Sequence, residues 1–503
     1  MRAALLGLDV GTSACKTTLF DEEGAVLHTA SFGYPLETPQ PGWAQQHPDD
    51  WYAAACRGIR AVLAGSGIAP GAVAAVAVDG QSWAAVAVDG AGDVLCPTPI
   101  WMDTRAREQC DRMAALCGEQ ALFDLCGNRL SPTYTLPKIL WYRDHAPEVF
   151  RHARSILQSN SYIVFRLTGE PTAEASQGFG LHCFDMRRDR YDDSVCRVLG
   201  IPEGLLPPIS PSHAVVGRVT AQAAAQCGLL EGTPVVAGGM DTCCGALGAG
   251  ILRAGQTQEQ GGSSGGMNVC LETYAADRAL ILARHVIPGQ WLIMGGTVGG
   301  GGSLKWFAEQ FGAAEREEAT RRGCSAYDVL CEEAAAVPAG SGGVTFLPYL
   351  NGERTPIWDV NAKGVFYGLD YGKTRAHAAR AVLEGVAFSL LHNIDVAQEA
   401  GVSVGGMVSI GGGAQSPFWT QMKSDVTGRP IAVPGTDTAA GLGAAMLAGL
   451  GVGVYRDFAH AVGSTVRIVR RHAPDPAAFE AYRLPYRRYR ELYGALKDFM
   501  ARY

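Results

Sequence analysis

Two short apolar runs joined by a polar, glycine-containing turn lie between Leu5 and Phe20. The first run ends at Asp9, Gly11 falls in the turn, and the second run begins beside Lys16. This pattern predicts a strand, a tight turn and a second strand. Glycine lets backbone N–H groups approach an anion, lysine adds a positive charge, and a carboxylate can hold a divalent metal. The stretch therefore fits a phosphate-binding hairpin, with an ordinary polar-tipped hairpin as the alternative.

The same pattern returns in the second half of the chain. Residues 255–260 read as a strand, 261–265 as a glycine- and serine-rich turn, and 267–271 as the return strand. A second echo relates residues 76–82 to residues 408–416, because both put Gly, Gln and Ser at the end of an apolar strand. These echoes predict a duplicated α/β unit with a cleft between the two copies.

Length and composition agree with two domains. The chain has 503 residues, more than a single hydrophobic core usually serves. Its 47% hydrophobic and 18% charged residues are values of a globular protein. The composition changes within residues 234–250, so we predict an N-terminal domain over 1–245 and a C-terminal domain over 246–503.

Charge and cysteine usage narrow the partners and the compartment. The net charge is −7 without a long basic run, which argues against nucleic acid. No apolar run reaches membrane-spanning length, and the N-terminus lacks the features of a signal peptide. The 14 cysteines contain no Cys-x-x-Cys pair. We therefore expect a reduced cytoplasmic protein that uses no membrane or nucleic acid, and a homodimer is left open.

Two short motifs resemble known functional motifs, but their spacing or the residues that follow do not fit. Residues 368–374 look like a P-loop, but the spacing is one residue short and we interpret them as a turn. Residues 262–266 match the Gly-x-Ser-x-Gly elbow of hydrolases around Ser264. That elbow needs a helix after the turn, and the following residues read as a strand.

Polar and aromatic residues gather at strand ends, a usual position for a binding site in a layered α/β protein. Asp241 follows an apolar run and a Gly-Gly turn, where it is either a helix N-cap or a general base for a hydroxyl group. Trp83 and Trp101 either belong to the core or stack on a sugar. No paired-His or clustered-Cys set predicts a transition metal.

A series of motifs in this order resembles the FGGY carbohydrate kinases, and within them the xylulokinase-like branch. The motifs span nearly the whole chain: Asp-Val-Gly-Thr-Ser-Ala-Cys-Lys at 9–16, Gly-Gln at 80–81, Trp-Met-Asp-Thr-Arg at 101–105, Pro-Lys-Ile-Leu-Trp at 137–141, Leu-Thr-Gly at 167–169, Gly-Gly-Met-Asp at 238–241, Gly-Thr at 296–297, Leu-Pro-Tyr-Leu-Asn-Gly-Glu-Arg-Thr-Pro at 347–356 and Gly-Gly-Gly-Ala-Gln-Ser at 411–416. The resemblance implies an actin-like (sugar kinase) α/β fold with two duplicated domains around a central cleft.

The resemblance also implies roles for individual residues. Asp241 would be the catalytic base, and Asp9 would assist Mg²⁺ and the reacting phosphates. Three further sets would bind ATP and the sugar. They are the phosphate contacts Gly11, Thr12, Ser13, Lys16, Gly262, Ser263 and Thr297, the adenosine contacts Gly412, Gly413 and Ala414, and the sugar contacts Gln81, Ser82, Trp83, Trp101, Asp103 and Thr242.

Two departures from the branch fall where it contacts the sugar. Xylulokinases typically carry Met-His where this chain has Ser82 and Trp83, and Asn where it has Thr242. The resemblance thus implies an ATP- and Mg²⁺-dependent kinase acting on a small sugar or polyol, with D-xylulose as the first candidate. A kinase for another ketose, a polyol or a sugar acid (ribulose, gluconate, glycerol or erythritol type) and a non-catalytic sensor of the same fold are the alternatives.

Overall fold

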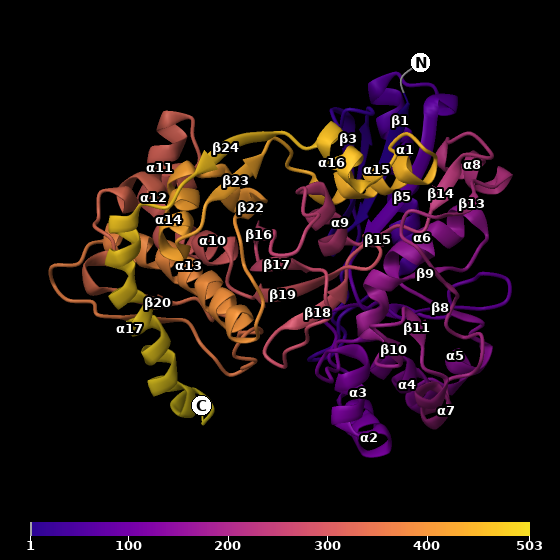
Figure 1. The fold of residues 1–503 in the computed structure, drawn as a ribbon, viewed down its shortest axis with the longest axis horizontal. Helices are drawn as coiled ribbons and strands as arrows, with labels where there is room; N and C mark the ends of the chain where they lie inside the picture. Colours follow the sequence, from indigo (N-terminus) through magenta and orange to yellow (C-terminus); the bar gives the residue numbers. More distant parts are fainter. Residues whose placement is uncertain (1–2, 503) are drawn as a thin grey trace.

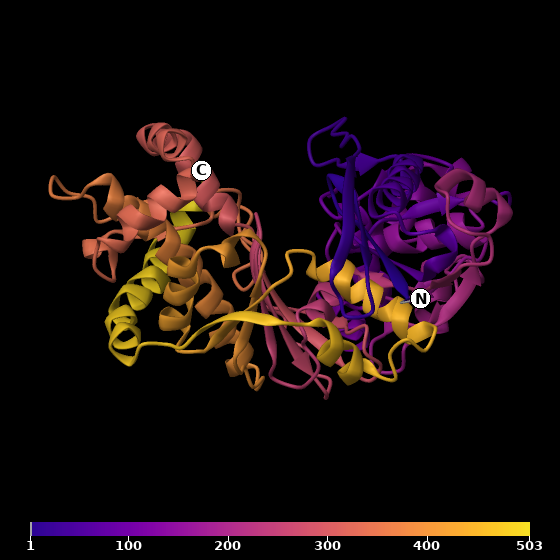
Figure 2. The same ribbon diagram turned by 90° about the horizontal axis from the view of Figure 1, so that it is seen from above.

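Two α/β lobes lie side by side in the computed structural model, which describes residues 3–502 (Figure 1). The N-terminal lobe is indigo to magenta, and most of the C-terminal lobe is orange to yellow. Seen from above, the lobes diverge from a shared base (Figure 2). The two-domain α/β architecture predicted from the sequence is therefore confirmed.

The N-terminal lobe is built on a seven-stranded mixed sheet in the order β13-β14-β5-β1-β2-β3, with β15 paired to the end of β5. Its strands are β1 (Ala4–Val10), β2 (Ala14–Phe20), β3 (Val26–Gly33), β5 (Val73–Gly80), β13 (Val215–Arg218), β14 (Pro234–Val236) and β15 (Gly239–Met240).

The C-terminal lobe carries the second seven-stranded sheet, in the order β18-β19-β17-β16-β22-β23-β24. Its strands are β16 (Thr257–Gly261), β17 (Gly265–Leu271), β18 (Ile281–Arg284), β19 (Trp291–Thr297), β22 (Met407–Ile410), β23 (Ile431–Pro434) and β24 (Ile468–His472).

The two sheets share one topology. In the N-terminal sheet β3, β2 and β1 pair antiparallel, β1, β5 and β14 pair parallel, and β13 closes the edge antiparallel. The C-terminal sheet repeats this order. Its strands β19, β17 and β16 pair antiparallel, β16, β22 and β23 pair parallel, and β24 closes the edge antiparallel. The hairpin β1–β2 thus corresponds to β16–β17, and the end of β5 to the end of β22. This confirms both echoes found in the sequence.

Helices cover the sheets and connect the strands. They are α1 (Pro48–Ser66), α2 (Arg107–Cys117), α3 (Glu119–Cys126), α4 (Thr135–His145), α5 (Pro147–His152), α6 (Ser159–Thr168), α7 (Asp193–Leu199), α8 (Ala221–Cys227), α9 (Asp241–Gly248), α10 (Gly301–Phe311), α11 (Ala313–Arg322), α12 (Ala326–Ala335), α13 (Arg375–Glu399), α14 (Pro417–Thr427), α15 (Ala439–Gly451), α16 (Phe458–Thr465) and α17 (Pro476–Met500). Helices α1 and α6 pack on one face of the N-terminal sheet, and α13 and α14 pack on the C-terminal sheet.

Shorter elements complete the fold. Two-stranded pairs join β4 (Gln45–Gln46) to β7 (Thr98–Pro99), β6 (Val86–Val88) to β8 (Ser155–Leu157), β9 (Ala173–Glu174) to β12 (Ile209–Ser210), β10 (Phe184–Asp185) to β11 (Arg190–Tyr191), and β20 (Thr345–Leu347) to β21 (Val365–Tyr367). Four 3₁₀ turns within residues 3–502 are η1 (Pro70–Ala72), η2 (Ala175–Gly180), η3 (Ser341–Gly343) and η4 (Gly412–Gln415). No helix in the described part of the chain is both long and apolar enough to cross a membrane.

The segment containing α15 and α16 returns from the C-terminal lobe to the N-terminal sheet. Helix α15 packs on β1 and β5, and Tyr455 beyond it donates a hydrogen bond to the carbonyl of Glu22 (3.0 Å). Both helices lie with the N-terminal lobe in Figure 1. The lobe therefore combines the N-terminal half of the sequence with one segment from far along the chain.

Helices α9 and α15 approach each other at backbone distance. A Cβ on Gly443 would lie 1.9 Å from the carbonyl oxygen of Cys244, and a Cβ on Gly248 would lie 1.9 Å from that of Ala439. Small residues fill both helices here, so the two backbones meet without side chains between them. This contact fixes α9, whose first residue is Asp241.

Replacing Gly443 with Ala should force α9 and α15 apart. Overpacking of a well-packed core costs about 1–3 kcal/mol, and this clash is with backbone that cannot turn away. We expect a lower melting temperature in a thermal unfolding scan. The matched control is Gly494→Ala in α17, where nothing lies within 4 Å of an added Cβ, and alanine favours a helix by up to about 1 kcal/mol. Equal melting temperatures for the two variants would contradict this account of the contact.

Candidate active site

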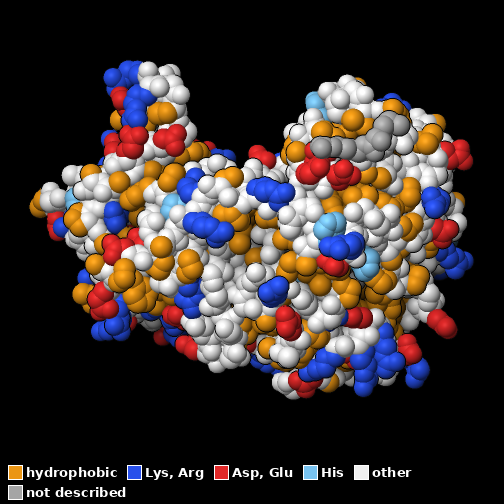
Figure 3. Space-filling view, turned by 45° about the horizontal axis from the view of Figure 1, so that its top comes forward, with side chains coloured by type: hydrophobic (Ala, Val, Ile, Leu, Met, Phe, Trp, Pro, Cys, Tyr) orange, Lys and Arg blue, Asp and Glu red, His pale blue; other side chains and the backbone are white. Residues whose placement is uncertain are grey.

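Three neighbouring cavities lie in or beside the hollow between the lobes, which Figure 3 shows from the outside. Residues of both lobes line two of them, and residues of the C-terminal lobe line the third. The central cavity, about 280 Å³, is lined by Asp9, Lys16, Asp241, Gly262 and Thr438 among others. The tryptophan cavity, about 220 Å³, includes Gln81, Ser82, Trp83, Trp101 and Arg354. The glycine cavity, about 380 Å³, includes Ser263, Ser325, Tyr327, Gly412 and Gly413.

The cavities share walls in a fixed order. Asp241, Thr242 and Gln260 line both the tryptophan cavity and the central cavity. Gly262 lines both the central cavity and the glycine cavity. A ligand in the central cavity is therefore in reach of groups in the other two, and Asp241 stands where the central and tryptophan cavities meet.

Asp9 reaches the central cavity because β1 stops there. It pairs across the hairpin with Lys16 on β2 and across the parallel ladder with Asp79 on β5. Burial raises the pKa of Asp9, although Asp79 and Lys16 act in the opposite direction. The predicted hairpin thus brings an acid and a base side by side at the cavity.

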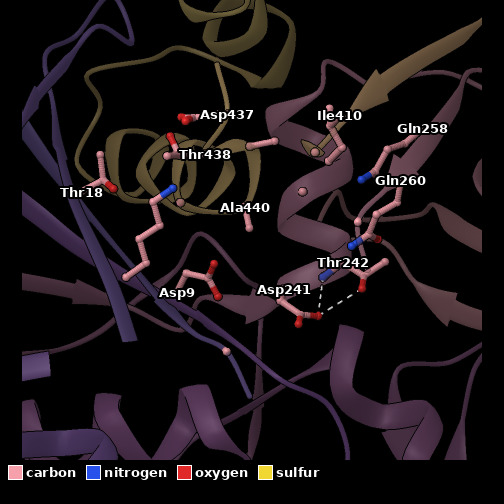
Figure 4. A pocket seen from close by; sticks show the side chains of 17 residues that line it. Asp9, Thr18, Asp241, Thr242, Gln258, Gln260, Ile410, Asp437, Thr438 and Ala440 are labelled. Carbon is pink, nitrogen blue, oxygen red and sulfur yellow. Dashed lines mark hydrogen bonds between the residues drawn. The ribbon is translucent and has the colours of Figure 1, made fainter. Parts of the chain in front are cut away.

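Asp241 is the first residue of α9 and is held in one orientation. Its Oδ1 accepts hydrogen bonds from the backbone N–H (2.6 Å) and the hydroxyl (3.1 Å) of Thr242, drawn as dashes in Figure 4. Its Oδ2 makes no hydrogen bond with the described residues, so it is free to take a proton. Burial, and then the charge of Asp9, raise the pKa of Asp241 to about 7. A carboxyl with this pKa can exchange a proton near neutral pH.

A glycine turn puts Asp241 in this place. Gly238 has φ 77°, and a Cβ on it would lie 1.9 Å from the carbonyl oxygen of Val78. Only glycine fits both the conformation and the space. The Gly-Gly turn noted in the sequence is therefore what lets β15 run beside β5 and present Asp241 to the cavity.

Asp79 lies beneath the other two carboxyls and is fully buried. Neither of its oxygens has a hydrogen-bond donor among the described residues. Burial, and then the charges of Asp9 and Asp241, raise its pKa well above the ordinary value. Burial and the two neighbouring carboxyls therefore favour the protonated form of Asp79.

The remaining wall of the central cavity suits an anion. Helix α15 begins there, and Thr438, Ala439, Ala440 and Gly441 line the cavity with its first turn. The free N–H groups and the dipole of a helix N-terminus favour phosphate. Lys16 contributes the cation, and Gly11 and Gly262 bring backbone from the two opposed hairpins.

The donor chemistry of the central cavity also fits Mg²⁺. Within residues 3–502 no cluster of three or more His, Cys, Asp or Glu side chains is arranged to hold a metal ion. Mg²⁺ does not need one, because it keeps several waters and binds through one or two carboxylates and the phosphates of a substrate. Asp9 is the carboxylate that fits this role.

The glycine cavity is formed by backbone and small side chains. Gly412 and Gly413 of η4 and the β16–β17 turn form one side, and a Cβ on Gly412 would have nothing within 4 Å. Ser325 and Tyr327 at the start of α12 line it as well. The exposed glycine faces and the tyrosine suit a flat ring system.

The tryptophan cavity combines aromatic walls with polar groups that lack partners. Trp83 has φ 62° and packs on Tyr134 and Phe179, at ring-centroid distances of 4.5 and 5.4 Å. Its indole N–H and the side-chain carbonyl of Gln81 have no partner among the described residues. Trp101 instead donates its indole N–H to the hydroxyl of Thr12 (2.9 Å).

Lys138 on α4 ties the two tryptophan segments together. Its ammonium is fully buried and donates to the carbonyls of Trp83 (2.8 Å) and Ile100 (2.7 Å), the latter directly before Trp101. Burial lowers the pKa of Lys138 to about 7. The sequence placed Lys138 in a motif without assigning it a function, because its contacts join segments far apart in the chain.

Four predicted site residues line none of these three cavities. Ser13 is exposed at the tip of the β1–β2 turn, and Thr297 is buried at the end of β19, paired with Gly265. Ala414 is buried within η4, where its carbonyl accepts a hydrogen bond from Arg470. Asp103 is buried in an ion pair with Arg105 (2.7 Å) and accepts the N–H of Ala44 (2.7 Å).

Thr12 lines the tryptophan cavity rather than the central cavity. All the other predicted site residues line one or two of the three cavities. The specific contacts expected for each, those of Thr12 with phosphate included, stay predictions.

Sequence reasoning missed the contribution of α15 to the central cavity. Asp437 and Thr438 precede this helix as Asp241 and Thr242 open α9, and both stretches continue through small residues and glycines. This Asp-Thr-x-x-Gly repeat was a readable signal, because a duplicated fold places equivalent helices against each other. Thr18, Gln258 and Gln260 on the strands were also missed.

The two rejected motifs have ordinary structural roles. Ser264 lies in the turn before β17, so a strand follows it and no hydrolase elbow forms. The stretch before α13 is a turn in which Asp370 accepts the N–H of Gly372 (2.7 Å) and pairs with Lys373 (3.1 Å).

Comparison with known proteins identifies the same family that the sequence motifs resemble. The model of the N-terminal domain of the FGGY family of carbohydrate kinases matches residues 4–248, and that of its C-terminal domain matches residues 260–452. The xylulose kinase of Bacillus subtilis is 33% identical over 98% of this chain and 97% of its own length. The L-xylulose/3-keto-L-gulonate kinase of Escherichia coli is 29% identical over 99% of this chain and 98% of its own length.

A solved structure extends the match to the fold. The crystal structure of xylulose kinase from Rhodospirillum rubrum superposes with a TM-score of 0.90 at 31% identity, covering 99% of this chain and all of that one. The two family models together cover most of the chain, and both lobes superpose in one arrangement. The chain therefore belongs to the FGGY family of carbohydrate kinases.

Proposed function

We propose that this chain transfers the γ-phosphoryl group of ATP to a hydroxyl group of a small sugar, with D-xylulose as the first candidate and D-xylulose 5-phosphate as its product. The order of the cavities carries the proposal. The sugar occupies the tryptophan cavity, the phosphates the central cavity and the adenosine the glycine cavity. Asp241 then stands at the junction where the sugar hydroxyl meets the phosphates.

The reaction needs one proton transfer and much charge stabilisation. Asp241 Oδ2 accepts the proton of the sugar hydroxyl as that oxygen bonds to the γ-phosphorus, and ADP leaves. Thr242 holds the other carboxylate oxygen, so Asp241 needs no reorientation. Lys16 and the N-terminus of α15 stabilise the charge spread over the phosphoryl oxygens. Asp9 would hold Mg²⁺ together with the phosphates, and the bound metal would neutralise charge on the phosphate chain.

The separation of the lobes suggests how water is excluded. Both lobes contribute walls to the tryptophan cavity, Trp101 from one and Met294 from the other. Closure of the lobes over bound sugar would exclude water that otherwise hydrolyses ATP. It would also bring the two glycine hairpins onto the phosphates from opposite sides.

The identity of the sugar is the more specific part of the proposal. Relatives at about 30% identity are xylulose kinases, and one acts on L-xylulose or 3-keto-L-gulonate. Kinases of another ketose, a polyol or a sugar acid remain alternatives, because Ser82, Trp83 and Thr242 line the tryptophan cavity and depart from the xylulokinase pattern. A sensor that binds without turnover is the alternative of another class.

A coupled ADP-release assay over a sugar panel tests the function. We expect sugar-dependent ADP release with at least one of D-xylulose, L-xylulose, ribulose, gluconate, glycerol and erythritol, and little without sugar. Sugar and nucleotide binding without ADP release would favour the sensor.

Asp241→Asn should retain sugar binding and lose turnover by several orders of magnitude, because it removes the proton acceptor and its charge. The pH profile supplies an independent readout. A base with a pKa of about 7 is deprotonated above that pH, so kcat/KM for the sugar should fall about tenfold per pH unit below it. The residual rate of the variant should lack this acidic limb. Turnover within about tenfold of wild type would exclude Asp241 as the base.

Asp9→Ala should cripple turnover, with partial recovery at high Mg²⁺, because phosphates can still hold the metal weakly. Initial rates over a Mg²⁺ titration measure this. Asp89→Ala serves as a control, since Asp89 is a turn residue outside the three cavities. If Asp9→Ala keeps the wild-type rate and Mg²⁺ dependence, Asp9 only shapes the turn.

Lys138→Met should raise the KM for the sugar by at least about tenfold and leave the KM for ATP within about twofold. The variant keeps the buried stem and loses the donors that hold the carbonyls of Trp83 and Ile100, a loss of about 1–3 kcal/mol. Steady-state kinetics in both substrates separate the two effects, and Lys497→Met on α17 is the control. Equal changes in both KM values would point to a global defect instead.

A further inference from the structure

Arg354 lies on the C-terminal-lobe wall of the tryptophan cavity, in the loop that follows β20. Its guanidinium carbon is 5.8 Å from the centre of the Trp101 ring, which belongs to the other lobe. A Cβ on Gly296 of β19 would lie 3.4 Å from one of its terminal nitrogens. Glycine at 296 and the indole of Trp101 thus leave a slot that the guanidinium fills.

The guanidinium of Arg354 has no hydrogen-bond or ion-pair partner among residues 3–502. Its Nε is buried without an acceptor. Other arginines with buried side chains are paired: Arg105 with Asp103 (2.7 Å), Arg284 with Asp189 (2.6 Å) and Arg380 with Glu384 (2.8 Å). Arg354 is the exception, and it is the one that lines the tryptophan cavity.

Of the two oxygens of the neighbouring Glu353 carboxyl, one is engaged with the backbone and the other, Oε2, has no hydrogen-bond partner among the described residues. Its Oε1 accepts the backbone N–H groups of Val298 (2.7 Å) and Arg354 (2.8 Å). Burial raises the pKa of Glu353 to about 7, so the carboxyl beside the guanidinium carries only part of a negative charge at neutral pH. The donors of Arg354 therefore remain available to a ligand.

An arginine offers five N–H donors in a planar fork and no acceptor. Leaving such a group desolvated and unpaired is costly, so a ligand that supplies acceptor oxygens gains affinity there. A carbonyl or carboxylate oxygen only accepts, whereas a hydroxyl group must also place its own proton. Arg354 lines the tryptophan cavity and not the central cavity, so it contacts the part of the sugar away from the phosphates.

We propose that Arg354 binds the end of the sugar remote from the phosphorylated hydroxyl and selects an acceptor-only oxygen there, the carbonyl of a ketose or the carboxylate of a sugar acid, over the hydroxyl of a polyol. The proposal rests on the kinase function above. Arg354 is then the specificity-determining residue from the C-terminal lobe, and its approach to Trp101 couples sugar binding to closure of the lobes.

The test compares matched substrates in wild type and Arg354→Met. Xylitol is D-xylulose with the carbonyl reduced to a hydroxyl, and D-gluconate carries a carboxylate. We expect wild type to prefer D-xylulose or gluconate to xylitol by kcat/KM. The variant should lose at least about 100-fold on the preferred substrate and less than about fivefold on xylitol, with the KM for ATP within about twofold. Whether D-xylulose or gluconate shows the loss identifies the source of the oxygen.

Two controls keep the test independent of folding and of turnover. Arg187→Met removes an arginine that also stacks on an aromatic ring, Tyr274 at 3.8 Å, outside the three cavities, and should keep the wild-type sugar ranking. Sugar binding without ATP, followed by tryptophan fluorescence, should weaken at least about tenfold in Arg354→Met while ADP affinity is retained. This readout stands even if no sugar in the panel is phosphorylated, an outcome that overturns only the kinase function.

Three results would overturn the proposal. They are an equal loss on D-xylulose, gluconate and xylitol, an unchanged ranking in Arg354→Met, and a wild type that binds xylitol as tightly as the carbonyl and carboxylate sugars. Arg354→Lys tests whether the planar guanidinium is needed, because lysine keeps the positive charge and lacks the fork of N–H donors. We expect it to recover less than about a tenth of the lost kcat/KM.

Discussion

The backbone-to-backbone contact of α9 with α15 is the constraint on which the site depends. Gly443 and Gly248 let the helices approach until carbonyl oxygens fill the places of side chains. The contact sets the first turns of both helices at the central cavity, one offering Asp241 and the other Thr438. Because α15 comes from the far end of the sequence, this packing also joins the second half of the chain to the N-terminal sheet.

Three buried carboxyl groups around the central cavity have raised pKa values. Burial raises the pKa values of Asp9, Asp79 and Asp241. The charge of Asp9 raises those of Asp79 and Asp241 further, whereas Asp79 acts to lower the pKa of Asp9. The pKa of Asp241 is about 7 in the folded chain, above its ordinary value of 3.8, so its contribution to stability falls as the pH rises from about 4 and levels off above about 7. The raised pKa that suits Asp241 to its proposed role as a base therefore lowers the folding stability.

The tryptophan cavity combines one buried side chain that has partners with several that lack them. Lys138 is buried and holds the segments of Trp83 and Trp101 through two hydrogen bonds to backbone carbonyls. The indole N–H of Trp83, the side-chain oxygen of Gln81 and the Nε of Arg354 have no hydrogen-bond partner among the described residues. In the proposed sugar site, this difference would set the binding specificity, because unpaired buried groups favour a ligand that satisfies them.

The sequence by itself determined the duplicated hairpins, the strand-end positions of Asp9, Gln81 and Asp241, and the family, because strand periodicity and glycine turns are local properties. Only the tertiary structure decided which of these residues share a cavity. Asp103 is buried, where it pairs with Arg105 and accepts the N–H of Ala44, and the hydroxyl of Thr12 accepts the indole N–H of Trp101. Lys138 and Arg354 gained their positions through contacts between residues far apart in the chain, which no local pattern encodes.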